Sequence, residues 1–202
     1  MKNKGLLIVV SGPSGVGKGT VVKELIKQSE NMHLSVSATT REKRPGEEHG
    51  VNYYYMTVDE FEKLKKEDGF LENAVFCDNY YGTPKRAVLD KIESGIDVVL
   101  EIEVKGAMQV RSKYPEGVYV LLVPPSMQEL EDRLRGRQTE DDETIKKRLA
   151  KAKEEMGHFD RYNYVVVNDE VEKATENLKA VIKAEKLRIE RNIEIFKESE
   201  LI

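Results

Sequence analysis

Glycines and a lysine are concentrated near the amino terminus at a spacing that suits phosphate binding. The segment follows a short apolar run and consists of Gly12, Pro13, Ser14, Gly15, Val16, Gly17, Lys18, Gly19 and Thr20. Glycines let successive backbone N–H groups turn inward, and the start of a following helix adds partial positive charge. A lysine at the end of such a loop reaches the β and γ phosphates of a nucleotide. The segment therefore predicts an ATP-binding phosphate loop, with a Gly-rich turn as the alternative.

The residue after the loop lysine departs from the common phosphate-loop pattern. That position usually holds a Ser or Thr that ligates Mg²⁺, whereas here Gly19 precedes Thr20. We therefore expect no metal ligand from the protein. Mg²⁺ would come with ATP and be held mainly by phosphates and water, with Thr20 on a phosphate oxygen. This Gly-Lys-Gly-Thr form resembles nucleoside monophosphate kinases.

Arginines and hydroxyl groups form a second group of residues suited to an anion. Arg41 and Arg44 lie within a dozen residues that also hold several Ser and Thr side chains. Arginine forks match phosphate oxygens bidentately. Further along, Glu72 offers a carboxylate that can accept from both N1–H and N2–H₂ of guanine, a donor pair that adenine lacks. The alternatives are a hairpin shaped by Arg44-Pro45-Gly46 and a solvated charge at Glu72.

The order of these motifs resembles the guanylate kinase family. The motifs are Ser37-x-x-x-Arg41-x-x-Arg44-Pro45-Gly46-Glu47, Gly50-Val51-Asn52-Tyr53, Phe70-Leu71-Glu72 and Tyr80-Tyr81-Gly82-Thr83. Matching segments extend from Gly12 to Asn168. The resemblance implies that guanine is bound by Ser37, Glu72 and Thr83, and that the GMP phosphate is held by Arg41, Arg44, Tyr53 and Tyr81. Taken singly, the tyrosines could instead belong to a local core, and structural roles are favoured for Tyr80 and Glu47.

Four further positions follow from the same resemblance. Glu103, in Glu101-Ile102-Glu103 at the end of an apolar strand, is expected to bind guanine or the water shell of Mg²⁺; a strand-end carboxylate paired with an arginine is the alternative. Arg137 and Arg148 are expected to close on the transferring phosphoryl group as part of a lid. Asn168 resembles the position that contacts the adenine of ATP.

The resemblance implies ATP-dependent phosphorylation of GMP to GDP, and likewise of dGMP to its diphosphate, by direct in-line phosphoryl transfer. Because a phosphate oxygen of GMP is already anionic, no general base is required. Catalysis would then rest on positioning and charge stabilisation by Lys18, Arg41, Arg137 and Arg148. The alternatives are a non-catalytic guanylate kinase-like interaction module and a monophosphate kinase for another base.

Short apolar runs supply the strands that must position these residues. They are Leu6–Val10, Val98–Ile102, Val118–Val123 and Tyr164–Val167. Their β-branched composition suits strands buried on both faces of a parallel sheet. Helical spacing is found after Lys18, over Asp142–Met156, and in a last helix with Leu178, Ile182, Ile189, Ile193 and Phe196 on one stripe. Alternating strands and helices predict an α/β fold.

The alternation of strands and helices is interrupted over Asn31–Glu93 and again over Arg133–Asp142. The segment from Asn31 to Glu93 contains Asn52–Val58 and Asn79–Thr83, which are expected to form short antiparallel strands, and a helix cap at Thr57. We expect a P-loop three-layer sandwich with a parallel core sheet, an inserted mixed α+β GMP-binding lobe and a short lid. The core would comprise residues 1–32, 94–126 and 158–202, the lobe 33–93, and the lid region 127–157.

Composition restricts the partners. Lys and Arg number 33 against 37 Asp and Glu, a formal net charge of −4. This balance favours small-molecule substrates, ATP and GMP, over nucleic acid or membrane, and it leaves monomer or homo-oligomer undetermined. One cysteine and the absence of a signal-peptide pattern predict a cytoplasmic protein.

Overall fold

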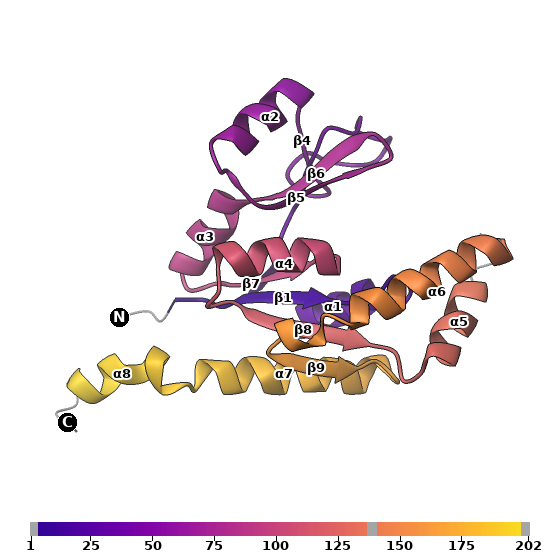
Figure 1. Ribbon diagram of the computed structural model, residues 1–202. Coiled ribbons are helices and arrows are strands. Elements are labelled where there is room, and N and C mark those ends of the chain that lie inside the picture. Colours follow the sequence, from indigo (N-terminus) through magenta and orange to yellow (C-terminus); the bar gives the residue numbers. More distant parts are fainter. Residues whose placement is uncertain (1–3, 137–140, 199–202) are drawn as a thin grey trace.

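A sheet of five parallel strands forms the centre of the molecule (Figure 1). The computed structural model describes residues 4–136 and 141–198. In spatial order the strands are β2 (Met32–Leu34), β7 (Asp97–Glu101), β1 (Leu7–Ser11), β8 (Val118–Val123) and β9 (Tyr164–Val167). Every neighbouring pair is parallel. The four strands predicted from apolar runs are confirmed. The sequence pattern missed β2, which is short and only partly buried.

Helices cover both faces of this sheet because its side chains alternate between them. Along β1, Ile8 and Val10 belong to one apolar cluster, and Leu7 and Val9 belong to another. The first cluster is completed by α1 (Lys18–Lys27) and α7 (Val171–Lys186), and the second by α3 (Lys85–Glu93) and α4 (Val104–Lys113). The arrangement confirms the predicted three-layer α/β fold.

A second, four-stranded sheet lies beyond α4 and α3 (Figure 1). Its strands, in spatial order, are β4 (Tyr54–Tyr55), β3 (Ala38–Thr39), β6 (Asn79–Pro84) and β5 (Phe70–Phe76). β6 is antiparallel to both β3 and β5, as expected. The antiparallel expectation for Asn52–Val58 was wrong. Only β4 forms there, and it runs parallel to β3 because the loop over residues 40–53 returns the chain to the end of the sheet where β3 begins.

Helix α2 (Val58–Lys66) packs on one face of this second sheet. It begins at the expected cap: the Thr57 hydroxyl accepts the backbone N–H of Glu60, and the Glu60 carboxylate accepts the backbone N–H of Thr57. Phe61 of α2 stacks on Phe70 with ring centroids 4.4 Å apart, so a small core of its own supports the sheet.

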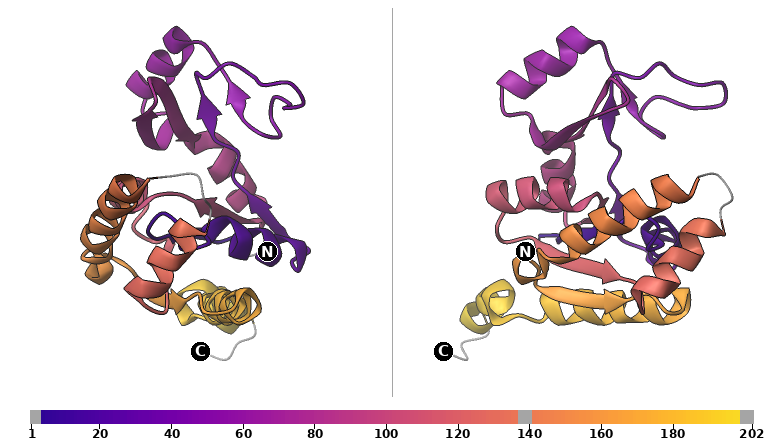
Figure 2. Two further views of the ribbon diagram at one scale, coloured as in Figure 1. Left: turned by 90° about the vertical axis from the view of Figure 1, so that its right-hand side faces the viewer. Right: turned by 45° about the vertical axis from the view of Figure 1, so that its right-hand side comes forward.

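Two helices stand together at one end of the core sheet (Figure 2). α5 (Met127–Arg135) and α6 (Asp142–Met156) contact each other through Leu130, Leu134 and Ile145. The helix predicted over Asp142–Met156 is therefore confirmed, and the short helix η1 (Phe159–Arg161) follows it.

The last helical stripe of the sequence is divided between two helices rather than one. Leu178 and Ile182 are buried under the core sheet in α7, which ends at Lys186. The next helix, α8 (Ile189–Glu198), exposes Ile189 and Ile193, so no common buried face extends across the break. The prediction of a single helix was wrong because the apolar spacing continues after the core that it packs against has ended.

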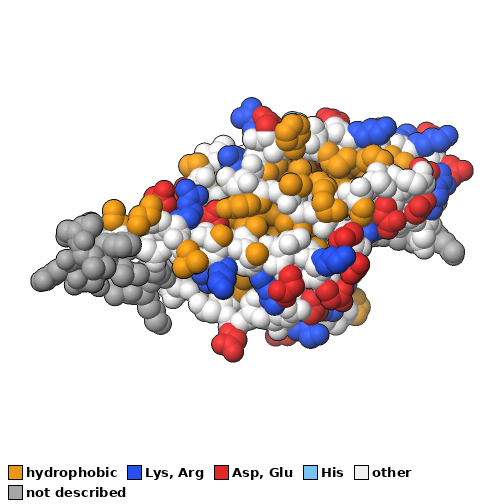
Figure 3. All heavy atoms as spheres, turned by 90° about the horizontal axis from the view of Figure 1, so that it is seen from below, with side chains coloured by type: hydrophobic (Ala, Val, Ile, Leu, Met, Phe, Trp, Pro, Cys, Tyr) orange, Lys and Arg blue, Asp and Glu red, His pale blue; other side chains and the backbone are white. Residues whose placement is uncertain are grey.

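Apolar side chains are also found on the surface. The edge strand β9 exposes Val165 and Val167. Seen from below, the face to which α7 and β9 contribute carries a group of hydrophobic side chains (Figure 3). In the described part of the chain, no helix has the length and apolar character needed to cross a bilayer.

Candidate active site

The predicted phosphate loop connects β1 to α1, with its glycines in conformations that other residues avoid. Gly15 and Gly17 have φ values of +89° and +92°, and Gly17 is the residue before α1. Neighbours also approach closely: a Cβ on Gly15 would lie 2.7 Å from Cδ2 of Leu134, and one on Gly17 would lie 2.6 Å from Nδ2 of Asn168. The loop is therefore shaped by both its own backbone and the segments around it.

Lys18 lies in the first turn of α1 and points back along the loop. Its Nζ donates to the backbone oxygens of Gly12 at 2.7 Å and Pro13 at 3.2 Å. Burial lowers the pKa of Lys18, and the carboxylates of Glu101 and Glu103 oppose that shift. These hydrogen bonds hold the cation at the mouth of the loop, where a phosphate oxygen can replace a carbonyl.

A cavity of about 460 Å³ opens beside the loop. It is lined by Ser14, Gly15, Gly17, Lys18, Gly19, Thr20, Glu101, Ile102 and Glu103. Partial burial raises the pKa of Glu101, and Lys18 counteracts this rise. The cavity thus places backbone amides and an ammonium group opposite two carboxylates. Across residues 4–136 and 141–198, no group of three or more His, Cys, Asp or Glu side chains is arranged to hold a metal ion.

Asn168 follows β9 and is buried against the loop. Its Nδ2 donates to the backbone oxygen of Val16 at 2.7 Å, and its backbone oxygen accepts from Nη2 of Arg133 at 2.9 Å. Arg133 also pairs with Glu129 at 2.9 Å on its own helix. This places Asn168 beside the loop that it supports. The contact between Arg133 and Asn168, which lie 35 positions apart, has no sequence signal.

The two arginines predicted for a lid differ in how far the structure describes them. Arg137 lies outside the described residues. Arg148 is half-buried on α6. Three residues later on the same helix, Nζ of Lys151 lies 3.1 Å from the Glu103 carboxylate and 3.4 Å from that of Glu155. Helix α6 is therefore linked to Glu103, which directly precedes α4 and lines the loop cavity.

Glu72 and Thr83 form a buried polar pair on strands β5 and β6. The Thr83 hydroxyl donates to Oε1 of Glu72 at 2.6 Å. Thr83 is 1% exposed and Glu72 is 8% exposed. Burial raises the pKa of Glu72, while hydrogen bonds from Thr83 oppose the rise. The other carboxylate oxygen faces α4, where a Cβ on Gly106 would lie 3.2 Å from it. The solvated charge considered for Glu72 does not describe this environment.

Arg41 is the centre of a second cluster, on the loop between β3 and β4. Its Nη2 lies 2.8 and 3.0 Å from the two oxygens of Glu47. Its guanidinium carbon is 5.5 Å from the ring centroid of Tyr53, and Tyr53 lies 6.0 Å from Tyr81. The structure therefore brings together three residues predicted to hold the GMP phosphate. Arg44 is different: its side chain is exposed, and its backbone N–H donates to Glu47.

Glu47 makes contacts around Arg41 that the sequence did not predict. It accepts from Arg41, from the backbone N–H of Arg44 and from the Tyr55 hydroxyl at 2.7 Å. The Arg41 guanidinium, with these two further donors, lowers the pKa of Glu47 to about 2. Its spacing of six residues from Arg41 was visible in the sequence, but the pairing depends on the turn between them.

Ser37 lies just before β3 and is half-buried. Its backbone oxygen accepts from the N–H of Tyr54 at 2.9 Å, which fixes the start of β3 against β4. Ser37, Thr83 and Tyr81 are thus carried by adjacent strands of the second sheet.

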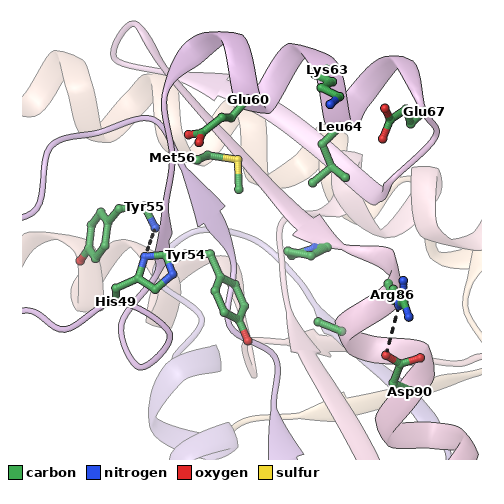
Figure 4. Close-up of a pocket in the computed structure, with 12 residues that line it drawn as sticks. His49, Tyr54, Tyr55, Met56, Glu60, Lys63, Leu64, Glu67, Arg86 and Asp90 are labelled. Atoms are coloured by element: carbon green, nitrogen blue, oxygen red, sulfur yellow. Dashed lines mark hydrogen bonds and ion pairs between the residues drawn. The ribbon is translucent and has the colours of Figure 1, made fainter.

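A separate cavity of about 680 Å³ lies between α2, β4 and the start of α3 (Figure 4). None of the predicted site residues lines it. Its cationic side chains, Lys63 and Arg86, are accompanied by the carboxylates of Glu60, Glu67 and Asp90. This balance of charge does not suit a phosphate group, so we do not place a nucleotide there.

Comparisons with known proteins agree on one family. The family model described as "Guanylate kinase" matches residues 4–185. A guanylate kinase of Halalkalibacterium halodurans is 52% identical, covering 96% of this chain and 95% of its own. One of Caldanaerobacter subterraneus is 50% identical, covering 97% and 95%. The crystal structure of guanylate kinase from Anaplasma phagocytophilum has a TM-score of 0.75 at 30% identity, covering 99% of this chain and 97% of that one.

Proposed function

Because this chain belongs to the guanylate kinase family, we propose that it transfers the terminal phosphoryl group of ATP to GMP, and to dGMP, at the phosphate loop. The observation that carries the proposal is the buried Glu72–Thr83 pair, which lies against α4. Glu103, which directly precedes the same helix, lines the cavity beside Lys18. One helix thus connects a site suited to guanine with a site suited to the phosphates of ATP.

The guanine site distinguishes bases by hydrogen-bond donors. The Glu72 carboxylate accepts the N1–H and N2–H₂ donors of guanine, and the hydroxyls of Thr83 and Ser37 complete the polar surface. Adenine would leave the buried carboxylate partly unpaired, which is a strong basis for rejection. Glu103, immediately before the helix that carries Gly106, would contact guanine or the water shell of Mg²⁺.

The phosphate of GMP would be held by Arg41, Tyr53, Tyr81 and Arg44. Glu47 and the flanking tyrosine rings hold the Arg41 guanidinium in one orientation, so little side-chain entropy remains to be lost when phosphate binds. Because the Arg44 side chain is exposed, its contribution requires it to swing toward the ligand.

The phosphates of ATP would be bound by the loop from Gly12 to Thr20, with Lys18 exchanging its bonds to loop carbonyls for phosphate oxygens. Asn168, next to the loop, would contact the adenine. Mg²⁺ bound to ATP would neutralise phosphate charge. The arrangement fits an ion that arrives with the nucleotide, because Glu101 and Glu103 face the loop cavity with oxygen donors suited to its water shell.

Catalysis requires no proton abstraction, because the attacking phosphate oxygen is already anionic. Lys18, Arg41, Arg148 and Arg137 would neutralise the oxygens of the transferring group, the role of Arg137 being implied by the family resemblance. We also propose that the lobe over residues 33–93 and the lid over 127–157 close on the core to exclude water.

The partners that fit this site are ATP and GMP. A cytoplasmic location is consistent with the single cysteine, Cys77, which is exposed and unbridged.

Turnover with ATP across GMP, dGMP, AMP, CMP and UMP tests the proposal. We expect GMP and dGMP to be preferred by orders of magnitude. No turnover with any acceptor would support a non-catalytic interaction module, and faster turnover of AMP or CMP would support a kinase for another base.

A further inference from the structure

Strand β5, which carries Glu72, has an open edge that a side chain closes. One side of β5 pairs with β6, and on the other side no strand is present in the described part of the chain. There the N–H of Asn73 donates to Oε1 of Gln109 at 3.1 Å, and Nε2 of Gln109 donates to the Asn73 oxygen at 3.0 Å. The Gln109 amide thus pairs with the backbone as a neighbouring strand would.

A second side chain of α4 fixes the strand on the other side of Glu72. Lys113, one helical turn after Gln109, donates from Nζ to the Phe70 oxygen at 2.7 Å and to Asp68 at 2.6 Å. Between these two attachments the pairing with β6 shifts register, and Leu71 enters the core cluster that contains residues of α4. Helix α4 therefore holds the backbone on both sides of Glu72.

The Glu72 carboxylate is also confined from α4 itself. Oε1 accepts from Thr83, and Oε2 lies against Gly106, which has no side chain to displace it. Movement of β5 along α4 would carry Oε2 away from this space. Gly106 and Gln109 are three residues apart, so the carboxylate and its backbone are set by one face of one helix.

We propose that Gln109 is a positioning residue for guanine recognition, because it locks the backbone beside Glu72 so that the carboxylate faces the base. The inference rests on the proposed function, in which Glu72 binds guanine. Gln109 would touch neither substrate. Its effect would be to keep the guanine site at a fixed distance from the phosphate loop, since α4 directly follows Glu103, which lines the loop cavity.

The test replaces Gln109 with Met, which has similar size and cannot form either hydrogen bond. We expect kcat/KM for GMP to fall by about tenfold to a hundredfold, as misplacement of a binding group does, with KM for ATP unchanged. We also expect the preference for GMP over inosine monophosphate, which lacks the 2-amino group, to narrow. If Gln109 had only a structural role, its loss would lower kcat/KM equally for GMP and for inosine monophosphate. Gln28→Met, on the exposed end of α1, is the matched control.

Placing Gln109→Met in a Glu72→Gln variant distinguishes failure of this inference from failure of the proposed function. If Gln109 acts through Glu72, then adding Gln109→Met to a Glu72→Gln variant should change the GMP kinetics by less than about twofold. Full additivity of the two substitutions in the GMP kinetics would overturn the role of Gln109. An unchanged preference for GMP over inosine monophosphate in Gln109→Met alone would do the same. An unchanged preference in Glu72→Gln would instead overturn the proposed guanine site.

Should Gln109→Met not fold, as judged by circular dichroism, Gln109→Glu takes its place. Its carboxylate can still accept from the N–H of Asn73 but cannot donate to the Asn73 oxygen. A smaller fall in kcat/KM for GMP, together with a narrowed preference for GMP over inosine monophosphate, supports the proposal. A preference equal to that of the wild type refutes it.

Discussion

Replacing Glu72 with Gln removes one charge and keeps the shape of the side chain. In the structure, Oε1 of Glu72 accepts from the Thr83 hydroxyl at 2.6 Å, and an amide oxygen can keep that bond. The amide NH₂ must then take the position of Oε2, beside Gly106. A donor would face a donor of guanine, so the variant should bind GMP poorly while its own fold is preserved.

The magnitude follows from the bonds that are lost. A hydrogen bond to a charged group contributes about 1.5–3 kcal/mol, and the substitution replaces one such bond by a donor–donor contact and weakens the other. A loss of about 3–4 kcal/mol corresponds to a fall in kcat/KM for GMP by two to three factors of ten, at about 1.36 kcal/mol per factor. KM for ATP should stay within about twofold, because Glu72 is absent from the loop cavity.

The thermal stability of Glu72→Gln, unlike its activity, should not fall. Burial raises the pKa of Glu72 above its ordinary value, which means that ionisation is less favourable in the folded chain than in the unfolded one. Such a carboxyl destabilises the fold at pH values above its pKa. The neutral Gln variant is therefore expected to have a Tm at pH 7.5 equal to or above that of the wild type.

Steady-state kinetics with varied GMP at saturating ATP, together with thermal melts of the ligand-free protein, measure both effects. The reasoning would be refuted by a Glu72→Gln enzyme whose kcat/KM for GMP lies within about threefold of wild type. A strongly lowered Tm would also contradict it, since the loss of activity would then reflect unfolding. Thr83→Val, which removes only the hydroxyl donor, should give a smaller loss than Glu72→Gln.

Three further perturbations address other parts of the molecule. Lys18→Met should lower kcat by at least about a hundredfold while calorimetry shows nearly unchanged GMP affinity, and near-normal turnover would remove Lys18 from the mechanism. Glu47→Gln should raise KM for GMP because Arg41 loses its orienting partner. Because the pKa of Glu47 is lowered to about 2, its ion pair should stabilise the fold fully above about pH 4.5 and lose that effect as pH falls toward 2. The difference in denaturation midpoint between wild type and Glu47→Gln should therefore shrink below pH 4.5, and a constant difference would argue against the ion pair. Asp97→Ala should lower stability by about 2 kcal/mol, since the buried carboxylate accepts from the N–H of Leu6 at 2.9 Å, without changing activity per folded molecule.

The placement of the Gly-rich loop between β1 and α1 could be predicted because its features are local. Nine consecutive residues supply the backbone amides, the lysine and the helix start, so the sequence order is already the spatial order. The core strands were predicted for a related reason, since each is an uninterrupted apolar run. The boundaries that failed, at β2, β4 and the break between α7 and α8, depend on neighbouring segments rather than on the residues within them.

The proposed guanine pocket was only partly visible in the sequence. Glu72 and Thr83 could be named, but their hydrogen bond requires β5 and β6 to pair as a hairpin. The pairing of Glu47 with Arg41 could not be predicted, because a carboxylate six residues away reaches the guanidinium only when the turn brings the two together.

What the sequence by itself determined is the chemistry available: a loop for phosphates, arginines for a second anion and a carboxylate suited to guanine. Tertiary structure alone decided which of these groups are held in place and by what. Gln109 lies 36 residues from the strand it supports, and Asn168 lies 152 residues from the loop backbone that it contacts. Such contacts form only when the sheet and its helices pack, because no local pattern of residue types encodes the distance between two segments of the chain.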